Sequence, residues 1–288
     1  MLKISMWNTM MLVRIMHRRM LFPTALLLII LFFCGIFGYI TRFNKKIFPE
    51  SHKSPEISIL WLHGLGDSGP ANEYMKTLFT SPELKTAKWS FPSAPKNPVT
   101  CNNGNVMPSW FDIIEIPITA GSPKNESSLF HAVSDVHAMI DKELATGISP
   151  ENFFLCGFSQ GGALTLTSAL LYPHALGGAA VLSGWVPFSN SVLDQMKPDA
   201  KKTPILWQHG VTDPVVLFDA GREGPPIIRK AGLSCEFKVI CRVCVIYLYY
   251  FCLLCQAYPG LSHAVTTEEL SLLQSWIQNR LHINQLSL

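Results

Sequence analysis

Four stretches of the chain are almost continuously apolar, and segments of helical periodicity separate them. Short runs of this kind are typical of parallel strands that are buried on both faces. The four stretches are residues 57–62, 152–156, 178–182 and 204–208. They predict the inner strands of a sheet.

Helical periodicity is found in three other places. Apolar side chains recur at steps of three and four from Leu129 to Leu144, which predicts an amphipathic helix that ends at Gly147. A second helix is expected directly after Ser159, and a third from Thr267. The apolar face of the third helix consists of Leu270, Leu273, Ile277 and Leu281. Strands that alternate with helices predict an α/β fold, with a mostly parallel central sheet and helices on both faces.

An uncharged apolar run of 21 residues, residues 20–40, lies near the N-terminus. A helix of this length can cross the hydrocarbon core of a membrane. Basic residues flank the run on both sides and no small-residue cleavage pattern follows it, which favours an uncleaved signal anchor. We therefore expect residues 1–50 to be an extension that attaches the protein to a membrane. Equal numbers of flanking basic residues leave the orientation open.

A second apolar segment, residues 239–256, contains four of the eight cysteines. Cys241, Cys244, Cys252 and Cys255 follow the spacing C-x2-C-x7-C-x2-C, which is similar to a zinc motif. The apolar spacer is too short, because double-knuckle zinc sites use about 15 to 20 residues at this place. We expect no metal. The other four cysteines are scattered, as in a reduced protein with small buried thiols.

Composition excludes two broad classes of protein. Of the 288 residues, 48% are apolar and 15% are charged, with a net charge of +3. This small charge, with no basic cluster, argues against a nucleic-acid partner. The 17 Phe, 7 Trp and 7 Tyr are enough for a large core, which argues against disorder. Residues 54–288 are then expected to form one globular domain.

The strongest chemical signal is the pattern G-x-S-x-G at residues 157–161, with Ser159 at its centre. A predicted strand precedes the pattern and a predicted helix follows it, as a nucleophile elbow requires. The glycines remove side chains that would collide across the sharp turn. Ser159 is therefore the candidate nucleophile.

A serine nucleophile needs a base and an acid, which follow it in the order acid, then histidine, in folds of this type. His263 lies in a turn before the last helix, where a loop at the carboxyl edge of a sheet presents a base. Solvated or capping roles suit His174, His209 and His282. Asp213 follows a strand end and is the predicted acid.

The loop after the first strand, residues 63–69, contains three glycines and is the expected source of an oxyanion amide. The predicted donors are the backbone amides of Leu65 and Gln160. His63 begins this loop, and a structural hydrogen-bonding role is expected for it.

Several motifs together resemble the acyl-protein thioesterase and carboxylesterase family of α/β-hydrolases. Their residues are most similar to those of its plant carboxylesterase-like branch. They are ILWLHGLGDSG, FPSAP with the later SWFD, GFSQGG, LSGWVP, HGxxDxxV and YPGLSH, and they span residues 57–281. The resemblance implies an α/β-hydrolase fold with Ser159, Asp213 and His263 as catalytic triad and Leu65 and Gln160 as oxyanion donors. It also implies no metal or cofactor, substrates such as acylated proteins or small lipophilic esters, and a cytoplasmic location if the N-terminal extension is set aside.

An apolar stretch follows Trp110 and runs to Ile118. It fits an acyl channel, with Trp110, Phe111 and Ile114 as candidate substrate contacts, and it fits a buried strand equally well. Sequence alone leaves both interpretations open.

The chain departs from the family pattern at residues 239–256, which interrupt the strand that begins at Cys235. Asp213 and His263 are consequently 50 positions apart, against 32 without the segment. The segment either bulges out as an apolar hairpin or displaces His263, and its codons would also fit a translated intron. Displacement predicts an alternative function, a ligand-binding protein without turnover, because about 1 Å of misplacement can cost about 10²-fold in rate.

Overall fold

The computed structural model describes residues 56–240 and 263–286. All of them belong to the unit Pro55–Leu288, which is separate from the unit Met1–Ser54. The predicted anchor, residues 20–40, and residues 241–256 of the second apolar segment lie outside the described residues. No helix within the described ranges is long and apolar enough to cross a membrane.

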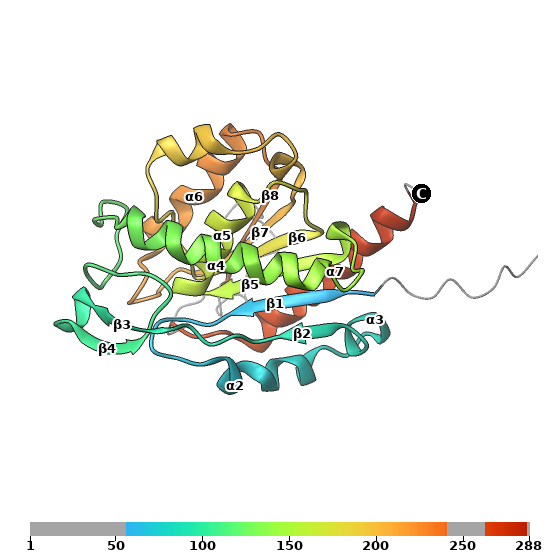
Figure 1. Ribbon diagram of the computed structural model, residues 1–288, viewed down its shortest axis with the longest axis horizontal. Coiled ribbons are helices and arrows are strands. Elements are labelled where there is room, and N and C mark those ends of the chain that lie inside the picture. Colours follow the sequence, from blue (N-terminus) through green and yellow to red (C-terminus); the bar gives the residue numbers. More distant parts are fainter. Residues whose placement is uncertain (1–55, 241–262, 287–288) are drawn as a thin grey trace, which may run out of the picture. The chain divides into compact units, whose positions relative to one another are not determined.

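A six-stranded parallel sheet lies at the centre of the domain, with strand order β2-β1-β5-β6-β7-β8. Its strands are β1 (Ser58–Leu62), β2 (Lys88–Ser90), β5 (Phe153–Phe158), β6 (Gly178–Leu182), β7 (Ile205–Gly210) and β8 (Cys235–Ile240). A separate antiparallel hairpin consists of β3 (Lys96–Val99) and β4 (Asn105–Pro108). Figure 1 shows the hairpin beyond the arrowheads of the strands, at the carboxyl edge of the sheet.

The helices of the described ranges lie between these strands in the chain, except the last helix, which follows β8. They are α2 (Gly69–Asn72), α3 (Pro82–Lys85), α4 (Glu126–Leu144), α5 (Gln160–Leu171), α6 (Phe218–Lys230) and α7 (Thr267–Leu286). Short 3-10 turns are η1 (Glu73–Leu78), η2 (Thr100–Asn102), η3 (Pro150–Asn152), η4 (Asn190–Gln195) and η5 (Ala200–Lys202).

Two hydrophobic layers cover the sheet, because successive strand residues point to opposite faces. Leu60 and Leu62 of β1 belong to the layer with α4, α5 and α6. Ile59 and Trp61 belong to the other layer, with α7, η1 and α3. Figure 1 shows α4, α5 and α6 on one side of the sheet and α2 and α3 on the other. The predicted α/β architecture with helices on both faces is confirmed.

The strand order creates a natural place for a ligand. The chain passes from β1 outward to β2 and later returns to the other side of β1 to form β5. The loops that follow β1 and β5 therefore diverge at the carboxyl edge. In parallel α/β sheets the crevice at such a switch point is where ligands bind.

The structure corrects the sequence reading at β8. The strand is unbroken from Cys235 to Ile240, and its last two residues, Val239 and Ile240, pair in parallel register with His209 and Gly210. These two residues were predicted to begin the segment that interrupts the strand. They extend the strand because their apolar, β-branched side chains suit it.

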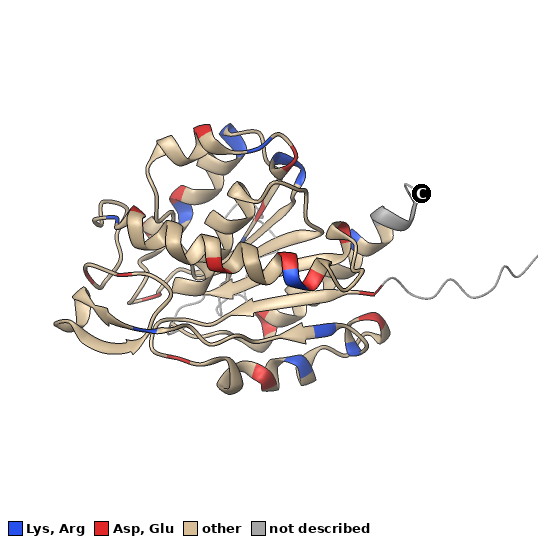
Figure 2. Cartoon of the chain, viewed as in Figure 1, with Lys and Arg blue, Asp and Glu red and all other residues tan. Residues whose placement is uncertain are grey.

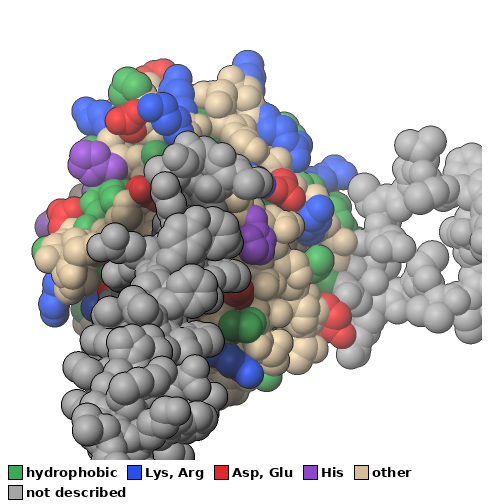
Figure 3. Space-filling model, turned by 90° about the vertical axis from the view of Figure 1, so that its right-hand side faces the viewer, with side chains coloured by type: hydrophobic (Ala, Val, Ile, Leu, Met, Phe, Trp, Pro, Cys, Tyr) green, Lys and Arg blue, Asp and Glu red, His purple; other side chains and the backbone are tan. Residues whose placement is uncertain are grey.

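Charged residues are interspersed over the outside of the domain. Figure 2 shows acidic and basic residues distributed over many of the helices and loops, with no extended surface of basic residues along one element. On the face seen in Figure 3, basic, acidic and hydrophobic side chains are mixed among the described residues. This distribution agrees with the small net charge and adds no indication of a nucleic-acid surface.

Candidate active site

Ser159 lies on the sharp turn between β5 and α5. Its backbone has φ 55° and ψ −120°, a conformation that a residue with a side chain rarely adopts. Its amide donates a hydrogen bond to the carbonyl of Leu182 on the neighbouring strand, at 2.9 Å. A Cβ on Gly161 would lie 2.1 Å from the Leu62 carbonyl oxygen, and one on Gly157 would lie 2.3 Å from the Gly161 carbonyl oxygen. Both glycines are therefore required by close backbone approach.

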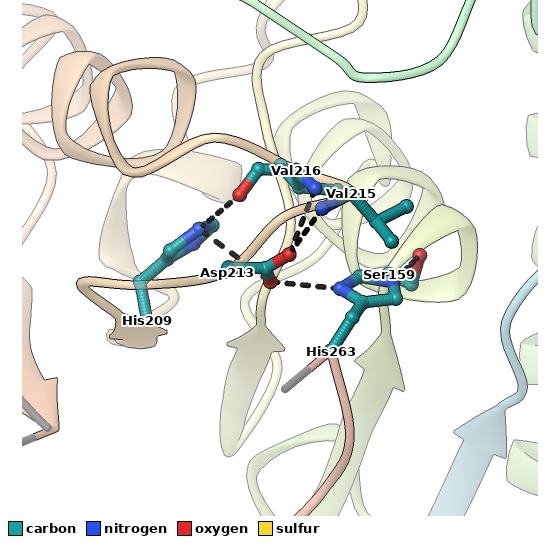
Figure 4. Close-up of polar contacts among 6 residues, drawn as sticks. All are labelled: Ser159, His209, Asp213, Val215, Val216 and His263. Carbon is teal, nitrogen blue, oxygen red and sulfur yellow. Dashed lines mark hydrogen bonds and ion pairs between the residues drawn. The ribbon is translucent and has the colours of Figure 1, made fainter. Parts of the chain in front are cut away.

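The imidazole of His263 lies directly beside this serine (Figure 4). Its Nε2 is 2.7 Å from Ser159 Oγ, and its Nδ1 is 2.7 Å from Asp213 Oδ2. Its ring packs against Phe158, with 4.7 Å between the ring centroids. An Nδ1–H that donates to the carboxylate leaves Nε2 free to accept the serine proton.

Asp213 is almost fully buried, and both of its oxygens are engaged. Oδ2 faces His263, and Oδ1 accepts the amides of Val215 and Val216, each at 2.9 Å. Burial acts to raise the pKa of Asp213, but the hydrogen bonds from His263 and the two amides outweigh it and lower the pKa. The carboxylate is therefore held ionised and fixed in orientation.

His209 lies on the side of Asp213 that faces away from His263 (Figure 4). Its side chain is fully buried, its Nε2–H donates to the Val216 carbonyl at 2.9 Å, and the same nitrogen is 3.9 Å from Asp213 Oδ2. Burial lowers the pKa of this imidazole, which favours the neutral form. The predicted solvated or capping role for His209 is wrong, because strand β7 carries its side chain into the interior beside Gly221.

The two predicted oxyanion donors belong to residues that adjoin the serine or its neighbour in space. Gln160 is the first residue of α5, and Leu65 follows Gly64, on which a Cβ would lie 3.4 Å from Ser159 Cβ. Neither backbone amide donates to another group within the described ranges. The Gln160 amide is at the N-terminus of α5 and the Leu65 amide is in the turn after β1, and free amides beside a nucleophile are suited to an oxyanion.

The side chain of Gln160 joins the elbow to the SWFD segment, a role that sequence analysis missed. Its Oε1 accepts the Trp110 amide at 3.1 Å, and its Nε2 donates to Ser109 Oγ and to the Phe111 carbonyl, at 2.9 and 2.6 Å. The Trp110 indole donates to the His63 carbonyl at 2.9 Å. The only available signal was an amide side chain at a buried position of the elbow.

His63 has the structural role expected for it. Its Nε2 accepts the Ala94 amide at 3.0 Å, which places the proton on Nδ1, and Nδ1 is 2.7 Å from the Gly64 carbonyl. Burial lowers the pKa of His63. Both ring nitrogens are occupied, so the imidazole shapes the glycine loop.

The candidate substrate residues occupy different environments. Trp110 and Phe111 are buried, and Phe111 packs against Trp185 at 6.1 Å between ring centroids. Phe111 and Ile114 line a space of only about 10 Å³, about one water molecule. A larger cavity of about 260 Å³ is also lined by Trp185, together with Ala220 and Ile227 of α6. Ile118 forms a parallel bridge with Val216 beside the acid loop, so this part of the stretch is strand-like.

His263 contacts both Ser159 and Asp213 in the structure. The predicted alternative, in which segment 239–256 displaces His263 from them, is therefore wrong. The described residues contain no group of three potential metal ligands. Cys241, Cys244, Cys252 and Cys255 lie outside them. Cys101, Cys156 and Cys235 are free thiols, and the last two are buried.

Comparison with known proteins agrees with this geometry. The family model for phospholipase/carboxylesterase matches residues 45–243. The carboxylesterase SOBER1 of Arabidopsis thaliana is 57% identical over 77% of this chain and 90% of that protein, and its crystal structure superposes with a TM-score of 0.71 over 78% and 99% of the chains.

Two further relatives bear on activity. Zea mays acyl-protein thioesterase 2 has a crystal structure with a TM-score of 0.63 and 25% identity, over 80% of this chain and 96% of that one. A probable inactive carboxylesterase of Oryza sativa subsp. japonica is 43% identical over 81% of this chain and 89% of that protein. With its α/β-hydrolase fold, its elbow and these matches, the chain belongs to the phospholipase/carboxylesterase family.

Proposed function

We propose that this protein is a serine hydrolase that cleaves carboxylic ester or thioester bonds through an acyl-enzyme intermediate on Ser159. The observation that carries the proposal is the pair of 2.7 Å contacts that His263 makes with Ser159 and Asp213. A histidine between a serine hydroxyl and a buried carboxylate is the arrangement that activates a serine for nucleophilic attack.

Each residue has one task in the proposed reaction. Ser159 Oγ attacks the acyl carbonyl while His263 Nε2 takes its proton, and His263 then returns the proton to the leaving alcohol or thiol. Asp213 orients the imidazole and stabilises the imidazolium. The amides of Leu65 and Gln160 donate to the oxyanion. Water, deprotonated by His263, then attacks the acyl-enzyme and releases the acid.

The contributions expected of these groups are large. General acid–base catalysis contributes about 10² to 10⁴ in rate, and one oxyanion donor contributes about 10² to 10³. A chain that lost any one of them would bind substrate with little turnover. The probable inactive relative makes this outcome a real alternative for the family, and the intact contacts of His263 argue against it here.

For the substrate, we propose acylated proteins or small lipophilic esters. The support is the similarity to a carboxylesterase and to an acyl-protein thioesterase. Phe111 and Ile114, which line a space of about 10 Å³, remain candidate acyl contacts. Trp110 is a third candidate, because its indole donates to the His63 carbonyl in the loop that begins beside the serine. In this conformation, the cavity beside Trp185 has more room for an acyl group.

Hydrolysis of p-nitrophenyl esters from two to sixteen carbons tests this function, with Ser159→Ala as the control. We expect turnover by the full chain and loss of at least about 10³-fold in the variant. The chain-length profile separates short-ester from long-acyl specificity. Equal turnover by the variant would refute the proposal.

For domain organisation, we propose that residues 1–50 are an extension to a hydrolase domain at residues 54–288, which carries the atypical apolar segment 239–256. The uncharged run at residues 20–40 would attach it to a membrane by a hydrophobic helix; the support is its length and flanking charges. Carbonate extraction of membranes tests this. Full chain in the supernatant, as for a variant lacking residues 20–40, would contradict it.

A further inference from the structure

The segment that carries His263 leads into α7, and two residues at the start of this helix cap each other's backbone amides. Thr266 precedes the first residue of α7, and its amide and Oγ1 both donate to Glu269 Oε2, at 2.9 and 3.0 Å. The Glu269 amide donates in return to Thr266 Oγ1, at 3.2 Å. This is a capping box, in which the N-cap residue and the third residue of the helix each accept the backbone amide of the other. His263 lies only three residues before it.

Unlike an ordinary capping carboxylate, Glu269 is completely buried, with an exposed fraction of 0%. Its carbonyl accepts a hydrogen bond from Gln208 Nε2 on β7, at 3.1 Å. Val265, between His263 and the cap, packs against the hydrophobic layer on the same face of the sheet. The cap is therefore attached to the strand that leads to Asp213.

The rest of α7 is held by contacts of its own. Glu236 Oε1 on β8 accepts the Trp276 indole N–H at 3.1 Å and the Arg280 guanidinium at 2.6 Å. Gln274 Oε1 accepts the amides of Thr80 and Ser81, at 2.7 and 3.2 Å. The helix is thus anchored to the sheet and to the loop before α3 by residues that follow His263 in the chain.

We propose that Glu269 is the positioning residue for His263. By closing the cap on Thr266 while it is docked against Gln208, it sets the imidazole between Ser159 and Asp213 from the α7 side. This inference rests on the proposed function, and it explains how His263 reaches its partners in a chain that carries the additional segment after β8.

The charge of Glu269 suits this role. Burial, together with the nearby charges of Asp213 and Glu268, raises the pKa of Glu269 to about 7, against the opposing effect of the Thr266 hydrogen bonds. Its Oε1 has no hydrogen-bond partner within the described ranges, while Oε2 makes the cap. A carboxyl protonated on Oε1 retains the cap and places no second negative charge beside Asp213. Glutamine has the same shape and also closes a capping box.

The test compares Glu269→Ala, Glu269→Gln and Glu236→Ala in the full chain, by ester hydrolysis. We expect Glu269→Ala to lower kcat by about 10- to 100-fold with KM changed less than about threefold, because about 1 Å of misplacement can cost about 10²-fold. Glu269→Gln retains kcat within about threefold. Glu236→Ala, which loosens the same helix at its other anchor, lowers Tm and leaves kcat within about threefold.

Three results would overturn the positioning role. They are a kcat within threefold of the wild type for Glu269→Ala, an equal loss for Glu269→Gln, or an equal loss for Glu236→Ala. The first result would show that the cap does not place the imidazole. The second would show that the shape of the residue 269 side chain is not what places it, and the third that any loosening of α7 lowers kcat to the same extent.

A second readout separates this inference from the proposed function, because it needs no substrate. The Nδ1 proton that His263 shares with Asp213 is observable by proton NMR, far downfield of the amide protons. We expect it in the wild type and in Glu269→Gln, and its loss in Glu269→Ala. Its persistence in Glu269→Ala, or its absence from the wild type, would overturn the positioning role whatever the turnover. Turnover that is independent of Ser159 would overturn only the proposed function.

Discussion

Replacing Asp213 with asparagine tests how the acid acts. Asp213 Oδ1 accepts two backbone amides, from Val215 and Val216, while Oδ2 faces His263 Nδ1. An asparagine must keep its carbonyl oxygen toward the two amides, because an NH2 group there would face two N–H donors. Its NH2 group then faces His263, where it can only donate. Nδ1 is forced to be the acceptor, so the proton moves to Nε2 and the imidazole can no longer accept the proton of Ser159.

The expected loss follows from this change of tautomer. The same substitution in a serine protease triad lowers kcat about 10⁴-fold, which corresponds to about 5.5 kcal/mol of transition-state stabilisation. We expect a similar loss in kcat for Asp213→Asn, with a much smaller change in KM. The assay is hydrolysis of a p-nitrophenyl ester, with folding checked by circular dichroism.

The matched control is Asp219→Asn on α6, an exposed carboxylate that pairs with Arg222 at the surface. Its activity is expected to equal that of the wild type, because exposed ion pairs contribute little. If the folded Asp213→Asn protein retained kcat within tenfold of the wild type, Asp213 would not be the group that orients His263.

Three further predictions concern the scaffold and the additional segment. Gly161→Ala would place a Cβ 2.1 Å from the Leu62 carbonyl oxygen and should lower the free energy of unfolding, measured by urea titration, by at least about 2 kcal/mol. The control Gly121→Ala, whose Cβ would meet nothing closer than 3.9 Å, should leave the stability nearly unchanged. Equal stabilities of the two variants would contradict the close approach at Gly161. Burial raises the pKa of Glu269 from 4.5 to about 7, so between these pH values the folded state binds a proton that the unfolded state has lost. The free energy of unfolding of the wild type should therefore fall relative to that of Glu269→Gln as pH rises from about 4.5 to 7, by about 3 kcal/mol at most. Parallel curves of unfolding free energy against pH would refute this. The full chain and a variant lacking residues 239–256 should both hydrolyse esters in a Ser159-dependent manner, and activity in the deletion variant alone would show that the segment displaces His263.

The inner part of the fold could be predicted because it follows from local patterns. Apolar runs gave the strands β1, β5, β6 and β7 to within two residues, and the period of three and four gave α4 and α7. The elbow could be found because a G-x-S-x-G turn between a strand and a helix has few structural alternatives. Chain order then left few histidines and acids to consider.

The elements that were missed depend on distant partners. Strand β2 is only three residues long, with one apolar residue between Lys88 and Ser90, so only its pairing with β1 identifies it as a strand. Each strand of the β3–β4 hairpin contains a proline, and neither has an alternating apolar pattern. His209 looks like a polar residue at a strand tip, and only the packing of Gly221 against its ring shows that it is buried. Thr266 and Glu269 carry a capping-box pattern in the sequence, but nothing local reveals that the carboxyl is buried.

The central claim, that Ser159 is a nucleophile activated by His263, is tested most directly by mass spectrometry of the intact full chain after reaction with a fluorophosphonate. The account predicts one adduct per chain, located on the peptide that contains Ser159, absent from Ser159→Ala and formed at least about 10²-fold more slowly in His263→Ala. A folded protein that forms no adduct, or an adduct that persists in Ser159→Ala, would contradict it.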